Sequence, residues 1–175
     1  MEKQQFKTIS MTGRLAYAIL CLETYLTRKH PEKDFTCLSN LLWLGTSSMG
    51  WDDYYELMDD LMSEFLFASE TYDPENFSQL KEEDFKKIHA LLRGIEKESD
   101  SFFSILHDIT SVYAYSEIPG CGAESIEILF KGISILEALG IPLPNIESIS
   151  FASFSERNGW GKRFDGTKLS LILNK

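Results

Sequence analysis

The chain has 175 residues, of which 43% are hydrophobic and 25% are charged, and its formal net charge is −10. This composition is typical of a folded globular protein and excludes the low-hydrophobicity, high-charge signature of disorder. The length fits one domain, residues 1–175, and a domain of this size buries roughly 70% of the surface that its unfolded chain exposes.

Negative charge is concentrated in the middle third of the sequence. Residues 51–110 carry sixteen Asp and Glu against five Lys and Arg, a net charge of −11, whereas residues 1–50 carry a net +2 and residues 111–175 a net −1. Proteins that bind nucleic acids need basic surfaces that neutralise phosphates, so no nucleic-acid partner is expected. A concentrated negative surface can attract a basic protein, or it can be a solvated surface without a partner.

The chain shows no features of a signal peptide, because Glu23 closely follows its first short apolar run and no small-residue cleavage site appears. No apolar stretch approaches the ~20 residues that span a membrane. We therefore expect a cytoplasmic protein without a membrane partner.

The chain has three cysteines, Cys21, Cys37 and Cys121. Because their number is odd and no Cys-x-x-Cys spacing occurs, the sequence predicts neither a disulfide framework nor a zinc site.

Apolar residues recur at three- and four-residue spacing in six segments, which predicts six helices. The first spans about Thr12 to Arg28 and ends before Pro31. The second follows Asp34, a residue suited to capping a helix, and continues to Leu44. Together these two segments are predicted to form a helical hairpin.

The third predicted helix, WDDYYELMDDLMSEFLF over residues 51–67, has the clearest pattern in the chain. Its apolar side chains form one stripe, and its acidic side chains lie on or near the other side. Two adjacent tyrosines cannot both point at the centre of a narrow stripe, so one of them is expected at the surface. The candidate contacts for a protein partner on this helix are Asp52, Asp53, Tyr54, Tyr55, Glu56, Asp59, Asp60 and Glu64.

The fourth helix is predicted to reach about Lys97, before the sequence ESDS. The fifth contains Phe102 to Tyr113, and the sixth runs from about Ala123 to a stop at Gly140. The predicted fold class is therefore all-α or mostly α, a bundle of about six helices. For residues 141–175, prolines and alternating apolar residues predict an extended tail or a short β-hairpin packed on the bundle.

Residues 151–166, FASFSERNGWGKRFDG, contain Asn-Gly and Asp-Gly, two dipeptides that favour tight turns with positive φ. Trp160 and Phe164 are predicted to hold this segment on the helices as a closing clasp. Three basic residues are expected to pair with the acidic helices: Arg157, Lys162 and Arg163. The alternative is an exposed loop whose Trp160 binds a partner.

No complete motif for catalysis, metal binding or nucleotide binding is present, so no cofactor and no metal are predicted. The most enzyme-like fragment is IPGCGAES, which places Cys121 just before a helix, where the dipole can lower the pKa of a thiol. A nucleophilic Cys121 would need a base, which the fold would have to supply from His89 or His107. Packing and capping are the favoured interpretations of these histidines. A cysteine-dependent enzyme and a helical scaffold or regulatory subunit remain alternatives to a binding protein.

Three segments, MTGRLAYAILCLETYL, LLWLGTSSMGWDDYYELMDDLMSEFL and FSERNGWGKRFDG, are similar in layout to small acidic helical immunity proteins encoded beside bacterial polymorphic toxins. The resemblance implies a non-enzymatic protein that binds one cognate toxin and blocks its active site or an essential surface. Acidic immunity proteins commonly face basic toxins such as nucleases, which would give the negative middle segment a role. The resemblance supplies no contact residues, so the candidates above come from charge and expected exposure.

Overall fold

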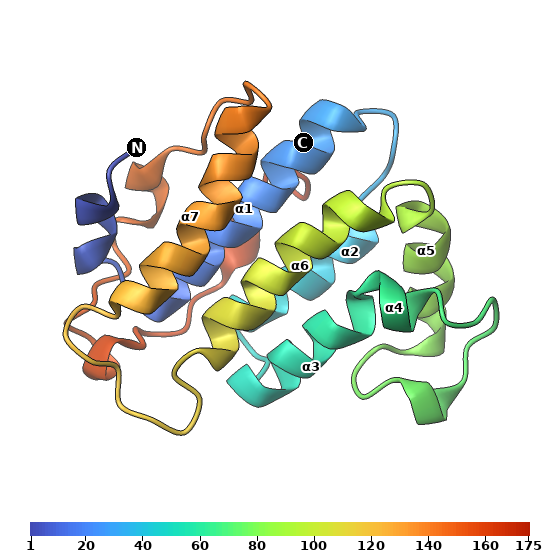
Figure 1. The fold of residues 1–175 in the computed structure, drawn as a ribbon, viewed down its shortest axis with the longest axis horizontal. Helices are drawn as coiled ribbons and strands as arrows, with labels where there is room; N and C mark the ends of the chain where they lie inside the picture. Colours follow the sequence, from blue (N-terminus) through green and yellow to red (C-terminus); the bar gives the residue numbers. More distant parts are fainter.

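The computed structural model describes residues 1–175 as one helical body with no β-sheet (Figure 1). Short 3₁₀ turns connect and follow the α-helices. The helices are α1 (Met11–Lys29), α2 (Thr36–Trp43), α3 (Trp51–Leu61), α4 (Ser63–Leu66), α5 (Glu82–Leu92), α6 (Glu96–Ser111) and α7 (Ala123–Ala138). The predicted helical class is confirmed.

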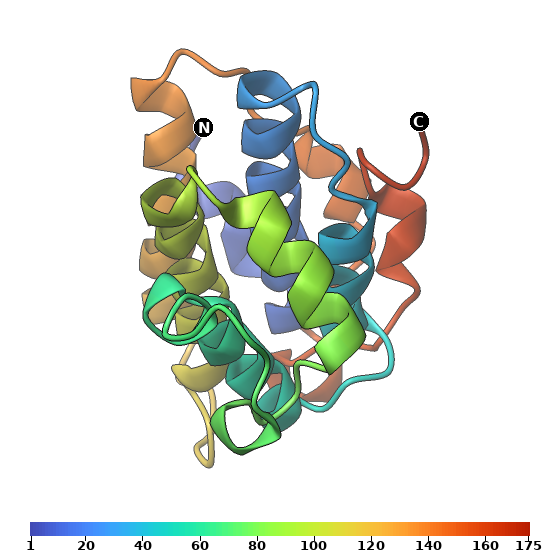
Figure 2. The same cartoon turned by 90° about the vertical axis from the view of Figure 1, so that its right-hand side faces the viewer.

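Helix α1 forms the centre of the fold. Every residue from Met11 to Leu26 is buried, because α6 and α7 pack along one side of the helix while α2 and the C-terminal segment lie on the other (Figure 2). A helix buried on all sides is typical of a protein interior. None of the helices is both long and apolar enough to cross a membrane.

The third predicted helix is interrupted at Met62, whose ψ of 145° is extended rather than helical. A residue from α6 explains the interruption. The Asp100 carboxylate accepts hydrogen bonds from the backbone N–H of Ser63, at 2.8 Å, and from the Ser63 hydroxyl. Ser63 therefore begins a new short helix, α4, and the single helix predicted over residues 51–67 is wrong in this detail.

The boundary between the fourth and fifth predicted helices is also displaced. The chain turns at Gly94, whose φ of +88° lies in the left-handed region that favours glycine, and α6 begins at Glu96. The sequence ESDS, predicted to separate the two helices, lies within α6. The sixth predicted helix, in contrast, ends before Gly140 as expected, and Gly140 has a φ of +65°.

The C-terminal segment is an extended clasp with 3₁₀ turns at Ile146–Ile149, Arg157–Gly159 and Gly166–Leu169. The alternative of a β-hairpin is wrong, since the chain has one isolated bridge, between Ile9 and Ser153. The alternating apolar residues of this segment do not share one buried face, since Ile149 is buried whereas Phe151 is 56% exposed.

Trp160 and Phe164 hold the clasp on the bundle. The Trp160 carbonyl accepts hydrogen bonds from the backbone N–H and the hydroxyl of Thr12, at 3.0 and 2.8 Å, and the Trp160 ring packs on Trp51 with centroids 5.1 Å apart. The Phe164 N–H donates to the Thr46 carbonyl at 2.9 Å. The interpretation of residues 151–166 as a closing clasp agrees with these contacts.

The basic residues of the clasp do not pair with the acidic helices, so that part of the prediction is wrong. Lys162 pairs with Glu156 inside the clasp, at 2.6 Å. Arg163 lies over the Trp51 ring, 4.8 Å from its centroid, and donates to the Gly45 carbonyl. Arg157 is exposed. The Arg163 guanidinium is therefore bound by an aromatic ring and a carbonyl oxygen, and not by a carboxylate.

The two predicted tight turns differ in why they need glycine. In the Asn158-Gly159 turn both residues have positive φ, 54° and 92°, as predicted. Gly166 has no positive φ, but a Cβ at this position would lie 2.2 Å from Cε3 of the buried Trp43 ring. The second glycine is required by a close approach to the core.

Arg14 is fully buried without a carboxylate partner. Its guanidinium donates to the carbonyls of Phe6, Cys121 and Gly122, at 2.7 to 2.9 Å, and to the Ser125 hydroxyl at 2.7 Å. Burial lowers the pKa of Arg14 to about 10, because the charged form is held away from water. This one side chain joins the N-terminal turn, α1 and the loop before α7.

Glu23 makes a corresponding set of contacts near the other end of α1. It is fully buried, and its carboxylate accepts hydrogen bonds from Trp43 Nε1 at 2.8 Å, the Ser170 hydroxyl at 2.7 Å, the Leu171 N–H at 2.6 Å and the Ser39 hydroxyl. No cation accompanies it. Glu23 therefore joins α1, α2 and the end of the chain.

The substitution Glu23→Gln should lower the free energy of unfolding by about 1–3 kcal/mol, because an amide nitrogen is a donor that accepts no hydrogen bond and would leave a buried donor beside it unsatisfied. Urea unfolding measures the change. The exposed Glu147→Gln is the control and should change the stability by less than about 0.5 kcal/mol. Equal stability of the two variants would contradict the role assigned to Glu23.

Candidate functional site

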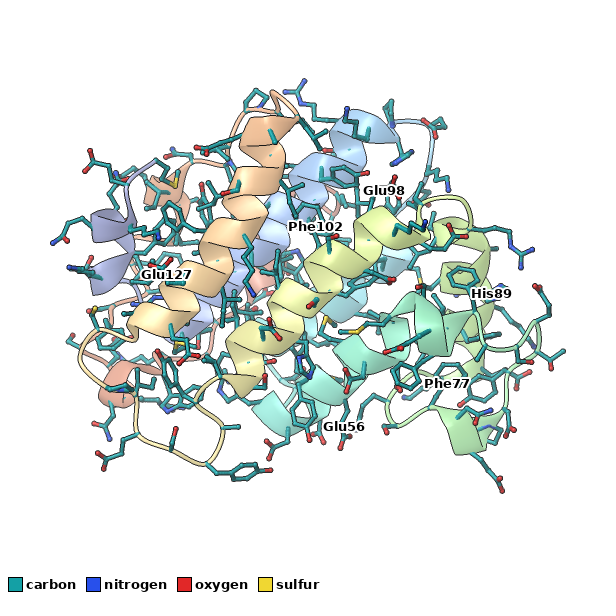
Figure 3. All side chains as sticks on the ribbon, in the orientation of Figure 1. Glu56, Phe77, His89, Glu98, Phe102 and Glu127 are labelled. Atoms are coloured by element: carbon teal, nitrogen blue, oxygen red, sulfur yellow. The ribbon has the colours of Figure 1, made fainter.

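The exposed side of α3 carries most of the predicted contact residues. Helix α3 packs along α6, and this contact buries Leu57, Met58 and Leu61. Asp52 and Asp53 are exposed and Glu56 is half-buried. Figure 3 shows Glu56 at the outer edge of the molecule, on the side of α3 away from α6.

Two predicted contact residues lie inside the protein. The Tyr54 ring is fully buried against Gly45, where a Cβ would come within 2.5 Å of it. Asp60 is 5% exposed, and its carboxylate accepts hydrogen bonds from the N–H groups of Ser78, Gln79 and Leu80 at 3.1, 2.7 and 2.8 Å. Tyr54 and Asp60 are structural residues, and the expectation that they lie on an exposed face is wrong.

Tyr55 is the accessible member of the tyrosine pair. Its ring meets the His107 ring of α6 edge-on, with centroids 5.7 Å apart. The His107 imidazole lies between two carboxylates, with Nε2 3.6 Å from Asp59 and Nδ1 3.3 Å from Asp108. The sequence did not predict this group, because Asp59 comes from a different helix and no local pattern places it beside His107.

Tyr115 is the most exposed of the large hydrophobic side chains, at 90% of its surface, and it stands in the loop that follows α6. Its φ of +61° lies in the left-handed region that residues other than glycine seldom adopt. The negative charge of Asp52 raises the pKa of Tyr115, so this phenol lies within electrostatic reach of α3. The sequence offered no pattern that would single out Tyr115.

We use the name acidic face for the surface formed by Asp52, Asp53, Tyr55, Glu56, Asp59 and Tyr115. Asp52, Asp53 and Glu56 belong to no ion pair. Their negative charge is therefore not neutralised by the protein itself.

Two other predicted contacts lie at or beyond the ends of this face. Glu64 is exposed but belongs to α4, after the bend at Met62. Trp160 is half-buried on Trp51 at the start of α3, where its main contacts hold the clasp.

No histidine makes a hydrogen bond with Cys121. The Cys121 carbonyl accepts a hydrogen bond from Arg14, whereas the polar contacts of His107 are with Asp59 and Asp108. The His89 ring packs on Phe67 and Phe85, with centroids 4.6 and 5.1 Å away. No group of three or more His, Cys, Asp and Glu side chains is arranged to hold a metal ion.

Comparison of the chain with protein-family models, with curated proteins and with solved structures finds no match.

The substitution Asp60→Asn should lower the free energy of unfolding by about 1–3 kcal/mol, because it removes the charge that binds three backbone N–H groups. Glu64→Gln, at an exposed acid in no ion pair, is the control and should leave stability within about 0.5 kcal/mol. Chemical unfolding of both variants measures the difference. If Asp60→Asn proved as stable as the control, the structural role of Asp60 would be excluded.

The substitution Asp52→Asn should lower the pKa of Tyr115 towards the ordinary tyrosine value, because it removes the main negative charge that disfavours the phenolate. Alkaline titration of the tyrosine ring signals by NMR, with Tyr115→Phe to assign the signal, measures the shift. Asp53→Asn is the control and should have the smaller effect. An unchanged Tyr115 titration in Asp52→Asn would show that the loop and α3 are not in electrostatic contact.

Proposed function

We propose that this protein is a non-enzymatic binding protein that neutralises a basic toxin by covering it with the acidic face. The observation that carries the proposal is the combination of unpaired carboxylates with two accessible tyrosines on one side of the molecule. The layout resemblance to acidic immunity proteins supports the same function.

The composition of the acidic face suits a protein interface. Tyrosine combines a large apolar area with a polar hydroxyl, and it is among the residues most often found at the energetic centre of interfaces. Tyr55 is half-buried and Tyr115 projects from the loop. The surrounding carboxylates can attract a basic partner over a distance and reject an acidic one.

The acidic face is also held in place before any partner arrives. Helix α3 packs along α6, and Tyr113 holds the loop by accepting a hydrogen bond from the Glu124 N–H at 3.1 Å. The Ser116 N–H donates to the Tyr113 carbonyl at 3.1 Å, which closes a turn around Tyr115. A surface that is already ordered loses less conformational entropy on binding.

The first experiment is affinity capture from a lysate of the organism that encodes the protein, followed by native mass spectrometry at low and moderate salt. The test variant is Asp52→Lys with Glu56→Lys. The control is Glu32→Lys with Glu147→Lys, which changes the net charge equally at exposed acids that belong neither to α3 nor to the loop that carries Tyr115. We expect one basic protein to bind the wild type and the control, to be lost from the test variant, and to dissociate as salt rises.

The inhibitory part of the proposal is tested by producing the captured protein together with each variant in cells. Growth should be rescued by the wild type and by the control pair, but not by the Asp52→Lys, Glu56→Lys protein. Binding that persists undiminished in the test variant would contradict the use of the acidic face. A partner that is harmless to cells would contradict the inhibitory role while leaving the binding role intact.

A further inference from the structure

The largest cleft of the protein lies at the other end of α6 from the acidic face. It has a volume of about 490 Å³ and is bounded by the C-terminal ends of α1 and α7 and the first turns of α6. Figure 3 shows Glu98 and Phe102 on this part of α6, beside α1. The volume falls within the ~300–1,000 Å³ typical of pockets for small ligands.

The floor of the cleft is apolar and partly aromatic. The Tyr25 and Phe102 rings lie with centroids 5.3 Å apart, and both are almost completely buried. Ile135 of α7 and Leu139, the residue that follows this helix, form another wall, and Leu139 is 44% exposed. A large aliphatic side chain left open beside buried aromatic rings provides an apolar surface that a ligand can cover.

The rim of the cleft is basic, whereas the chain as a whole has a net charge of −10. Lys29 and Lys97 line the cleft, are exposed, and take part in no ion pair. Glu98 is the one carboxylate among the lining residues. Two unpaired ammonium groups therefore face one carboxylate at the mouth of an apolar cleft.

Tyr25 supplies a polar group inside the cleft. Its hydroxyl makes no hydrogen bond within the chain and is not among the buried unpaired polar atoms, so the oxygen is open to the cleft although the residue as a whole is only 5% exposed. Burial, followed by the negative charge of Glu98, raises the pKa of Tyr25. At neutral pH the phenol is protonated and can donate a hydrogen bond to an anion.

We propose that this cleft binds a small amphipathic monocarboxylate, with its apolar chain over Ile135 and Leu139 and its carboxylate held by Lys29, Lys97 and the Tyr25 hydroxyl. A charge-assisted hydrogen bond to a carboxylate is stronger than a neutral one, which favours an anion at this position. A ligand of this class leaves no charge over the apolar floor, where an unpaired charge is costly.

Glu98 distinguishes a carboxylate ligand from a cationic one. A bound carboxylate is repelled by Glu98, so Glu98→Gln should tighten its binding. An amine of the same chain length would be attracted by Glu98 and repelled by the two lysines. Glu98→Gln would therefore weaken the binding of the amine, and removal of the lysine charges would strengthen it.

The experiment is isothermal titration calorimetry of the full chain with octanoate, compared with octan-1-ol and octylammonium, and with NMR to locate the shifted signals. We expect saturable binding of octanoate, weaker binding of the alcohol, and shifted signals at Tyr25, Phe102 and Leu139. Lys29→Gln with Lys97→Gln should weaken octanoate binding about tenfold, because two nearby positive charges are removed.

The matched control is Lys7→Gln with Lys168→Gln, two exposed lysines that line none of the cleft and belong to no ion pair. It should bind octanoate as the wild type does. The proposal is overturned if octanoate shows no saturable binding, if octylammonium binds more tightly, or if the control weakens binding as much as the cleft variant. Stronger binding of octanoate by Glu98→Gln would support it, and weaker binding would overturn it.

Discussion

Two ionisable side chains of α1, Arg14 and Glu23, are buried without a charged partner, and much of the non-helical chain is organised around them. A charge removed from water is tolerated only where hydrogen bonds replace its hydration. For Arg14 these come from the N-terminal turn and the loop before α7, and for Glu23 from α2 and the last residues of the chain. The loop before α7 and the end of the chain, each more than a hundred residues from its partner on α1, are thus joined to this one helix. The clasp and the loop before α7 have defined positions although neither contains regular α-helix or sheet.

This arrangement extends to the acidic face. Tyr115 stands in a loop that begins where α6 ends and finishes at Cys121 and Gly122, whose carbonyls accept hydrogen bonds from Arg14. At its start, the loop is held by Tyr113. The direction in which Tyr115 projects therefore depends on contacts that lie in the interior. A surface held in this way differs from a mobile loop, because little further ordering is needed when a partner binds.

The parts of the fold that were predictable from the sequence are those in which the local pattern and the packing agree. The apolar spacing of α1 and α7 set their ends within a few residues, and Gly140 marked the end of α7.

The interruption at Met62 was not predictable, because it depends on Asp100, which is distant in sequence. Asp60 was assigned to the surface for a related reason. Charge and spacing alone could not show that three N–H groups of a later loop would surround its carboxylate.

Opposite charges gather at the two ends of α6, a separation that the net charge of −10 does not show. This helix runs 16 residues from the basic rim of the cleft to the loop that carries Tyr115, a length of about 24 Å at 1.5 Å per residue. At physiological ionic strength the Debye length is about 8 Å, so exposed charges at one end of α6 are largely screened from those at the other. The lysines of the cleft therefore do little to neutralise the acidic face, and the acidic face does little to repel an anion from the cleft. Because the two surfaces share no residue and lie at opposite ends of one helix, the small ligand and the protein partner proposed above would not compete for the same surface.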